Sequence, residues 1–461
     1  MQEGEETIAA IATPVGQAGI GIVRLSGPRS LSIASKIFRP RKGRGPLRSH
    51  RLYLGELVDP ATAEPLDEVL VSYMKAPRSY TREDVVEINC HSGYVLLSKI
   101  LELLLSLGAK PARPGEFTLR AFLNGRIDLS QAEAVVDLIN AKSEKGLALA
   151  SQQIRGAFRD RIAALKTPVL DLLARLEAAI DYPEEAEEIL DMDEITDIIQ
   201  RQVIAPINVL IQEHARRRVW VDGVQTVIVG RVNAGKSSLL NRLLNEERAI
   251  VTPVAGTTRD VIESTVTLEG LPLRLLDTAG LRRAKDQVEE LGLELARRKM
   301  EEADLVLVVV DQSRPLGPED RETIRRCKGK ETIVVLNKID LPCGLDPAEE
   351  GEVFGDLCRV RISALTGEGI PLLARAIREQ VLGGETDLTT SQVVPNLRHR
   401  EALGEALRNF EGALESLRGG RPLEIAAFEL RAGLDALGAI VGETTDADLL
   451  DRIFSRFCLG K

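Results

Sequence analysis

One glycine-rich segment has the residue types that bind a chain of phosphates. Gly230-Arg-Val-Asn-Ala-Gly-Lys-Ser237 follows an apolar β-like run and precedes a helical pattern. Its glycines let backbone N–H groups wrap the phosphates, Lys236 can reach the β- and γ-phosphates, and the Ser237 hydroxyl can ligate magnesium. The segment therefore predicts a nucleoside triphosphate site that uses Mg²⁺. Its predicted nucleotide contacts are Asn233, Ala234, Gly235, Lys236, Ser237 and Ser238.

Two later motifs select guanine over adenine. Asn337-Lys-Ile-Asp340 follows an apolar strand pattern, and Ser363-Ala-Leu365 follows at the distance of a loop that supports guanine. The Asp340 carboxylate can accept hydrogen bonds from the guanine N1–H and 2-amino group, which adenine does not offer. The predicted base contacts are Asn337, Lys338, Asp340, Ser363, Ala364 and Leu365.

The γ-phosphate end of the site is predicted from two further segments. Asp277-Thr278-Ala279-Gly280 follows a strand pattern, as the magnesium-side Asp and γ-phosphate-sensing Gly of a GTPase do, and Thr257 and Thr258 lie in a polar loop suited to a switch. Ras-like proteins place a water-orienting Gln after that glycine, whereas this chain has Leu281. Glu289 is the candidate acid for water activation; its alternative role is to stabilise a helix N-terminus.

Composition limits the class of protein. The 461 residues suggest about three domains, and 28% charged with 44% hydrophobic residues argue against disorder. Five scattered cysteines without a Cys-x-x-Cys pair, and an acidic N-terminus instead of a signal peptide, predict a cytoplasmic protein without a zinc site. The chain contains no apolar run that is long enough to predict a membrane span. The net charge of −10 argues against binding nucleic acid through overall charge.

One local exception to this acidity lies between Arg39 and Arg51, where there are six basic residues and no acid. A solvated loop and an RNA-contacting loop are both compatible with it.

The elements that position these motifs fall into α/β and helical parts. Strand patterns at Thr7–Ala12, Gly21–Leu25, Val69–Tyr73 and Val85–Asn89 and a helix at Val95–Leu107 predict a mixed α/β start. Strands and helices then alternate from about 221 to 384, as in a parallel sheet. These predicted elements are Val224–Val229, Ser237–Asn245, Leu273–Leu276, Glu290–Met300, Asp304–Val310, Thr332–Leu336 and Ile370–Gln380.

The remaining segments are predicted to be helical. Apolar residues recur at helical spacing from Ile154 to Ile180, although Pro168 should kink or restart that helix. The acidic Asp181–Glu194 stretch is expected to be an exposed hinge. Further helices are predicted at Arg398–Leu417, Leu423–Val441 and Asp446–Phe457, the last with Thr445 and Asp448 as a capping box.

The predicted fold class is multidomain, α/β plus all-α. It comprises a mixed α/β domain at 1–119, a helical domain in two pieces at 120–220 and 385–461, and an inserted Ras-like P-loop GTPase domain at 221–384.

The chain resembles the MnmE (TrmE) family of tRNA-modification GTPases over essentially its whole length. The resemblance rests on the phosphate loop with Asn233, the switch Thr252-Pro-Val-Ala-Gly-Thr-Thr-Arg-Asp260 and three segments outside the GTPase part. Those three are Gly19-Ile-Gly-Ile-Val-Arg-Leu-Ser-Gly27, Leu123-Asn-Gly-Arg-Ile-Asp-Leu-Ser-Gln-Ala-Glu133 and the terminal Cys458-Leu-Gly-Lys461.

The resemblance implies a homodimer that works with the FAD-containing flavoprotein MnmG in a heterotetrameric or larger complex. Together they would add an aminomethyl-type group, such as carboxymethylaminomethyl, to C5 of the wobble uridine of certain tRNAs. The one-carbon unit would come from 5,10-methylenetetrahydrofolate or 5-formyltetrahydrofolate. The main rival is a ribosome-assembly or regulatory GTPase that acts only as a binding switch.

The family pattern also implies the ion ligands and the catalytic group. Ser237 and Thr258 would ligate Mg²⁺, and Glu289 falls on the family's catalytic glutamate. K⁺ would be held by Asn233, Thr252, Val254 and Thr257 and would supply the positive charge that an arginine finger supplies elsewhere. The switch contacts with GTP would be Thr252, Pro253, Val254, Ala255, Gly256, Thr257 and Thr258.

The family's folate pocket maps to Arg24, Glu87, Arg126 and Lys461, in the N-terminal domain that would also form the dimer. The family usually has Lys where this chain has Arg126. Cys458 is needed for modification in the family, in a role that the residues alone leave open. Ordinary surface ion pairs are the alternative for the four folate positions.

Overall fold

The computed structural model describes residues 6–14, 16, 18–42, 45–185, 190–245, 264–276, 300–327, 329–383 and 394–461, without the side chains of residues 185, 215–218 and 264. The chain divides into two compact units. The first comprises Met1–Val136, Ile154–Thr167 and Arg431–Lys461, and the second comprises Asp137–Gln153 and Pro168–Leu430. The predicted division into four segments stays a prediction.

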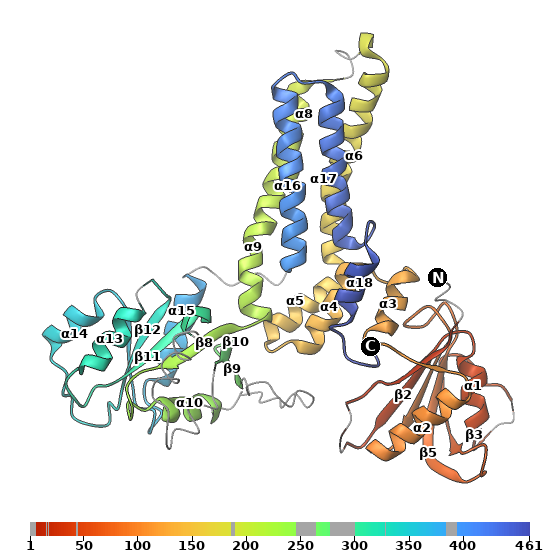
Figure 1. Ribbon diagram of the computed structural model, residues 1–461, viewed down its shortest axis with the longest axis horizontal. Coiled ribbons are helices and arrows are strands. Elements are labelled where there is room, and N and C mark those ends of the chain that lie inside the picture. The colour runs from red at the N-terminus through yellow and green to blue at the C-terminus, as the bar shows by residue number, and fades with distance from the viewer. Residues whose placement is uncertain are drawn as a thin grey trace. The chain divides into compact units, whose positions relative to one another are not determined.

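The first unit contains a seven-stranded sheet in the order β3-β4-β5-β6-β2-β1-β7 (Figure 1). Neighbouring strands are antiparallel except β1 and β7. Val23 and Leu25 are buried on one face, under α1 (Ser30–Ile37) and α2 (Tyr94–Ser106), so Arg24 between them projects from the other face. The strands are β1 Ile8–Ile11, β2 Gly21–Ser26, β3 Phe38–Pro40, β4 Arg51–Val58, β5 Pro65–Met74, β6 Val85–Cys90 and β7 Lys110–Pro111.

Segments from both ends of the chain complete the first unit. α3 (Glu116–Leu123) and the start of α4 (Leu129–Asn140) pack against α18 (Ala447–Phe454). Their shared core contains Leu119, Leu129, Ala132, Phe454 and Phe457. This packing brings the terminal Cys458–Lys461 motif into the unit that holds the seven-stranded sheet.

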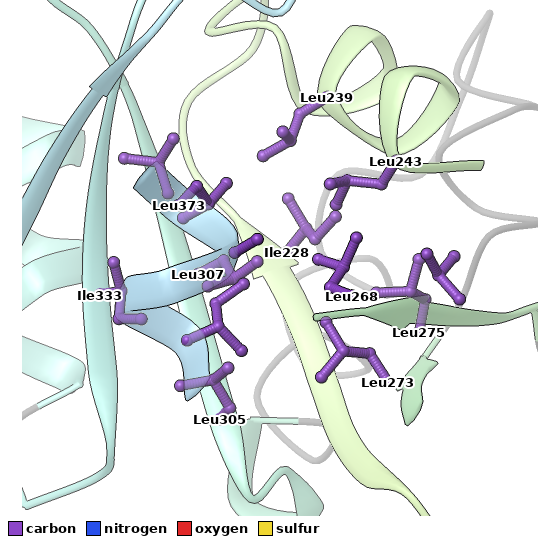
Figure 2. Packing of buried hydrophobic residues seen from close by; sticks show 14 of the residues in the cluster. Ile228, Leu239, Leu243, Leu268, Leu273, Leu275, Leu305, Leu307, Ile333 and Leu373 are labelled. Carbon is purple, nitrogen blue, oxygen red and sulfur yellow. The ribbon is translucent and has the colours of Figure 1, made fainter. Parts of the chain in front are cut away.

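The second unit contains a six-stranded sheet in the order β13-β12-β11-β8-β10-β9. All its pairs are parallel except β9 with β10. Alternate residues of β11 enter two different cores: Leu305 and Leu307 join the one that includes α10 and α15, whereas Val306 and Val308 join the one that includes α13 and α14. Figure 2 shows Leu239 and Leu243 of α10 pointing toward the strand side chains of the first core. The sheet is therefore buried on both faces.

The bounds of this sheet and its helices are β8 Val224–Val229, β9 Ser264–Leu268, β10 Leu271–Leu275, β11 Leu305–Asp311, β12 Thr332–Asn337, β13 Cys358–Ile362, α10 Lys236–Asn245, α13 Pro318–Arg326, α14 Pro347–Phe354 and α15 Ile370–Leu382.

The other helices of the chain are long and mostly amphipathic. Within the second unit, α16 packs against α8 and α9. Their bounds are α5 Glu144–Ile154, α6 Ala157–Asp181, α8 Met192–Ile198, α9 Ala205–Val221, α16 Leu397–Arg418 and α17 Leu423–Val441, with a π-helical segment at Ile199–Ile204 and a 3₁₀ turn at Pro183–Glu185. Among the described residues no helix is long and apolar enough to cross a membrane.

The loop before α5 holds the edge of the six-stranded sheet. Lys142 Nζ donates to Thr265 Oγ1 at 3.1 Å, and Thr267 Oγ1 donates to the Lys142 carbonyl oxygen at 3.1 Å. Both threonines belong to β9, the strand that follows the predicted switch segment.

The predicted fold class is confirmed, and the predicted bounds of β8 and α17 match the structure. β9, α13, α14 and β13 were not predicted. The predicted helix at Glu290–Met300 lies outside the described residues except for Met300, which is helical.

Two predictions about the helical parts are wrong, and a third is wrong in part. The long helix starts at Ala157, because Ile154 ends α5, and it does not restart at Pro168. Buried Leu165 and Val169 pack on both sides of the proline, and the Thr167 hydroxyl donates to the Ala163 carbonyl. The acidic stretch is not hinge throughout, since Asp191 caps α8 through the N–H groups of Asp193 and Glu194.

The predicted capping box of the last helix is also absent. Asp446, not Thr445, is the N-cap of α18 and makes no side-chain capping bond. Within the part of the chain that the structure describes, Thr445 Oγ1 is buried without a hydrogen-bond partner.

Candidate functional site

The loop between β8 and α10 has a backbone that only glycine can adopt at two positions. Gly230 has φ +142°, and a Cβ there would lie 2.2 Å from the Val309 carbonyl oxygen. Gly235 has φ +101°, and its Cβ would lie 2.0 Å from Asn337 Nδ2. Asn233 also has a positive φ, of 66°. Such left-handed residues turn successive N–H groups into a concave, anion-binding surface.

Lys236, the first residue of α10, lies against this loop. Its Nζ donates to the carbonyl oxygens of Gly230 at 2.7 Å and Arg231 at 2.8 Å. Burial lowers the pKa of Lys236, and the charge of Glu319 partly offsets that effect. The ammonium group is thus held over the loop that would wrap the phosphates, with Ser237 and Ser238 in the following first turn of α10.

Asn337 connects the three predicted nucleotide motifs that the structure describes. Its Nδ2 donates to the Ala234 carbonyl at 2.9 Å, and its Oδ1 accepts from the Ala364 N–H at 2.9 Å. The side chain is buried, so both bonds are shielded from water. The phosphate loop, the Asn337–Asp340 motif and the Ser363–Leu365 loop therefore form one site.

Ser363 orients the carboxylate that is predicted to recognise the base. The Ser363 hydroxyl donates to Asp340 Oδ1 at 2.5 Å and accepts from the Thr366 N–H at 3.1 Å. Asp340 itself is exposed, as a group that receives a ligand must be. The arrangement presents a fixed acceptor to the solvent side of the loop.

Lys338 is anchored beneath the base site by a second carboxylate. It has a positive φ of 71°, and its Nζ donates to Asp311 Oδ2 at 2.6 Å. Burial raises the pKa of Asp311, but hydrogen bonds from Lys338 and Ser313 outweigh that effect and leave it below its usual value. The pair holds the Lys338 stem in place.

Arg242 is a positioning residue that no sequence motif indicated. From α10 its Nε donates to the Ala364 carbonyl at 3.2 Å, and its Nη2 donates to the Leu365 carbonyl. The helix that starts at the phosphate loop thus also holds the guanine-side loop. An arginine on a helix carries no spacing signal, so only the fold reveals this contact.

The first unit brings the predicted folate residues together. Arg24 and Glu87 lie directly opposite each other on β2 and β6. Arg24 Nε donates to Glu87 Oε1 at 2.8 Å, and its Nη1 donates to the Gly460 carbonyl at 3.2 Å. The Arg24 guanidinium lies 5.9 Å from the Tyr80 ring centroid, and Arg126 lies over the same ring at 4.8 Å.

The terminal motif is packed against β1 and α3. Gly460 has φ +87°, and a Cβ there would lie 2.4 Å from the Ile11 carbonyl oxygen. The Lys461 carbonyl accepts from the Phe117 N–H at 3.2 Å, while Cys458 is exposed. Tyr80 and Phe117 line this region beside Arg24 and were not predicted, because no motif includes them.

The γ-phosphate end lies outside the described residues. This applies to Thr252, Pro253, Val254, Ala255, Gly256, Thr257, Thr258, Asp277, Thr278, Ala279, Gly280 and Glu289. Of the four predicted K⁺ ligands, the structure describes Asn233 alone, and of the two predicted Mg²⁺ ligands, Ser237 alone. The described residues contain no cluster of three or more His, Cys, Asp or Glu side chains that could hold a metal.

Two family models and full-length relatives match nearly the whole of this chain. The family model "MnmE helical domain" matches residues 129–458, and "GTP-binding protein TrmE N-terminus" matches residues 7–126. The tRNA modification GTPases MnmE of Thermoanaerobacter pseudethanolicus and Moorella thermoacetica are 47% and 46% identical to this chain; each alignment covers 99% of it, and 99% and 100% of those proteins respectively. The G domain of the T. maritima FeoB iron transporter aligns with 35% of this chain and 97% of that one, at 24% identity. The TM-score of that alignment is 0.25.

Proposed function

This chain belongs to the MnmE family of tRNA modification GTPases, and we propose that it hydrolyses GTP with Mg²⁺ and K⁺ to drive modification of the wobble uridine of certain tRNAs. The modification would be a carboxymethylaminomethyl or aminomethyl group on C5. Its one-carbon unit would come from a tetrahydrofolate, and its partner would be the flavoprotein MnmG. The chain would act as a homodimer in the cytoplasm.

The observation that best supports GTP binding is that the Asn337 side chain hydrogen-bonds to both Ala234 and Ala364. These bonds fix the distance between the phosphate loop and the Asp340 carboxylate, which Ser363 orients. Guanine offers Asp340 two N–H donors, and the carboxylate can accept both in a charge-assisted pair. A purine without them would leave the acceptor unpaired.

The loop before α10 supports the binding of phosphate groups, which Mg²⁺ would accompany. Positive φ angles at Asn233 and Gly235 direct backbone N–H groups into the loop, and Lys236 supplies a cation beside them. Ser237 with Thr258 would hold the magnesium ion, and Asn233 with Thr252, Val254 and Thr257 would hold potassium. When bound, the two cations would stabilise negative charge on the transferred phosphate.

Glu289 would be the catalytic residue that orients and deprotonates water. The chain has Leu281 where Ras-like proteins have Gln, so an acid from the following segment would do this work. Lys236 would stabilise charge on the β- and γ-phosphate oxygens.

Folate would bind where Arg24, Glu87, Arg126 and Lys461 converge in the first unit. Glu87 can accept hydrogen bonds from the amino-pterin edge, and the basic side chains suit the glutamate tail. The aromatic rings of Tyr80 and Phe117, beside Arg24, offer apolar surface for the ligand. Exposed Cys458 precedes the Gly460 carbonyl that Arg24 contacts, which supports a role at the same site.

Nucleoside analysis of tRNA tests the proposal most directly. Cells that lack the gene should lose the C5-modified wobble nucleosides, and the wild-type gene should restore them. Cys458→Ser should not restore them although it hydrolyses GTP at the wild-type rate, because Cys458 belongs to the first unit and the phosphate loop to the second. Unchanged nucleosides in the deletion strain would refute the proposed function in favour of a binding switch without a covalent role.

A further inference from the structure

A group of cations that form no ion pair with any described residue lies where β4 begins and β5 ends in the seven-stranded sheet. We call Arg48, Arg51, Lys75 and Arg78 the basic edge; all four are exposed. Arg48 lies in the loop between β3 and β4, Arg51 begins β4, and Lys75 and Arg78 follow the end of β5.

Backbone bonds hold the two segments of the basic edge together. The His50 N–H donates to the Tyr73 carbonyl at 2.7 Å, and the Lys75 N–H donates to Ser49 Oγ at 2.9 Å. Arg51 lies opposite Tyr73 in the β4–β5 register, and Lys75 follows Tyr73 by two residues. Lys75 is therefore a diagonal neighbour of Arg51 across the two strands. The loop is further fixed by a 2.8 Å bond from the Arg48 N–H to the Tyr53 hydroxyl.

These cations are not neutralised within the described residues. None of the four forms an ion pair with a residue that the structure describes, whereas Arg41 is paired with Glu68 at 2.7 Å. The Asp84 carboxylate is engaged in other bonds: its Oδ1 accepts from the Ala76 N–H and its Oδ2 accepts from the Tyr73 hydroxyl.

We propose that the basic edge binds the phosphate backbone of the tRNA substrate. This inference rests on the proposed function and names the surface that such a substrate would use. The chain carries a net charge of −10, so its overall field repels RNA and binding requires a local cationic surface. Each phosphate neutralised by Lys or Arg releases condensed counterions, which makes the affinity fall steeply with salt.

The test is the salt dependence of tRNA binding by the full-length protein. The plot of log K for association against log [salt] has a negative slope. The variant R48Q/R51Q/K75Q/R78Q should make this slope less steep by about three, since each phosphate contact contributes roughly 0.7 to 0.9. The control R321Q/R325Q/R326Q/R361Q removes the same charge from arginines that are all ion-paired. It should keep the wild-type slope.

Three results would overturn the inference: equal slopes for the wild type and the basic-edge variant, an equal loss in the control, or no tRNA binding by the wild type. Thermal unfolding midpoints show whether each variant is folded. If the fourfold variant does not fold, the double variants R48Q/R51Q and K75Q/R78Q replace it, each with a smaller expected change in slope. The proposed function is judged separately, by the nucleosides of the deletion strain.

Discussion

Asn337 Nδ2 donates a 2.9 Å hydrogen bond to the carbonyl oxygen of Ala234, which ties the predicted guanine side of the site to the predicted phosphate side. The same amide accepts from Ala364, so one buried side chain joins three loops that are far apart in sequence. Loss of this side chain would leave a carbonyl and an N–H unsatisfied. Base and phosphate recognition are therefore coupled structurally.

Asp340→Asn should exchange the base specificity. The amide oxygen can still accept from N1–H, but the amide NH₂ would face the 2-amino donor of guanine, whereas it can donate to the C2 carbonyl that xanthine has at that position. GDP should therefore bind roughly 10²-fold more weakly while XDP gains. Ser363→Ala should weaken GDP only about two- to tenfold, because Asp340 keeps its charge and loses one orienting bond. Nucleotide competition measures both, and an unchanged preference for GDP in Asp340→Asn would remove Asp340 from the base site.

Gly235→Ala should abolish nucleotide binding. Its Cβ would lie 2.0 Å from the Nδ2 atom that bonds Ala234, and φ is +101°, so both the amide and the backbone would have to move. Gly351→Ala is a matched control, because Gly351 lies in α14 with open space around it and should gain about 0.5 to 1 kcal/mol of stability. Calorimetry with GDP and thermal unfolding provide the readouts. Wild-type affinity in Gly235→Ala would show that the loop has another conformation.

Glu289→Gln should keep GTP binding within about threefold and lower turnover roughly 10²- to 10⁴-fold, as expected on losing a general base. The neighbouring Glu290→Gln is the control and should turn over normally. Stopped-flow binding and phosphate release measure the two effects separately. Normal turnover in Glu289→Gln would assign that carboxylate to helix stabilisation.

Replacing K⁺ by Na⁺ at constant ionic strength should slow GTP hydrolysis at least tenfold while GDP affinity changes little. K⁺, which is larger than Na⁺, would match the site built from Asn233 together with Thr252, Val254 and Thr257. Its charge would act mainly in the transition state. Asn233→Ala should make the rates in the two salts equal. Equal wild-type rates in both salts would exclude the potassium mechanism.

The cysteines should differ widely in reactivity toward iodoacetamide at pH 8. Burial raises the pKa of Cys90 and of Cys327 to about 11, so on the order of one thiol in 10³ is ionised there, whereas Cys343 and Cys458 are exposed. Peptide mass spectrometry of the folded protein should find the exposed pair alkylated first and the buried pair only after unfolding. Equal labelling before unfolding would contradict the packing around Cys90, whose thiol donates to the Gly21 carbonyl.

The sequence located residues that carry a motif and missed those that only position them. Lys236, Asn337, Asp340 and Ser363 were assigned from spacing, and the structure joins their motifs into one site. Arg242 acts through two backbone carbonyls, a contact that depends on how α10 packs and leaves no sequence pattern. In the same way, the expected restart of α6 at Pro168 does not occur, since tertiary packing outweighed local preference.

The contact of Lys142 with β9 has a consequence for strand slippage. Thr265 and Thr267 alternate with Val266, which is 1% exposed in the core beneath the sheet. A shift of β9 by one residue would bury both hydroxyls and leave the valine facing Lys142, because side chains alternate along a strand. The two bonds with Lys142 therefore fix the register of β9: a register shift would break both of them as well as expose Val266.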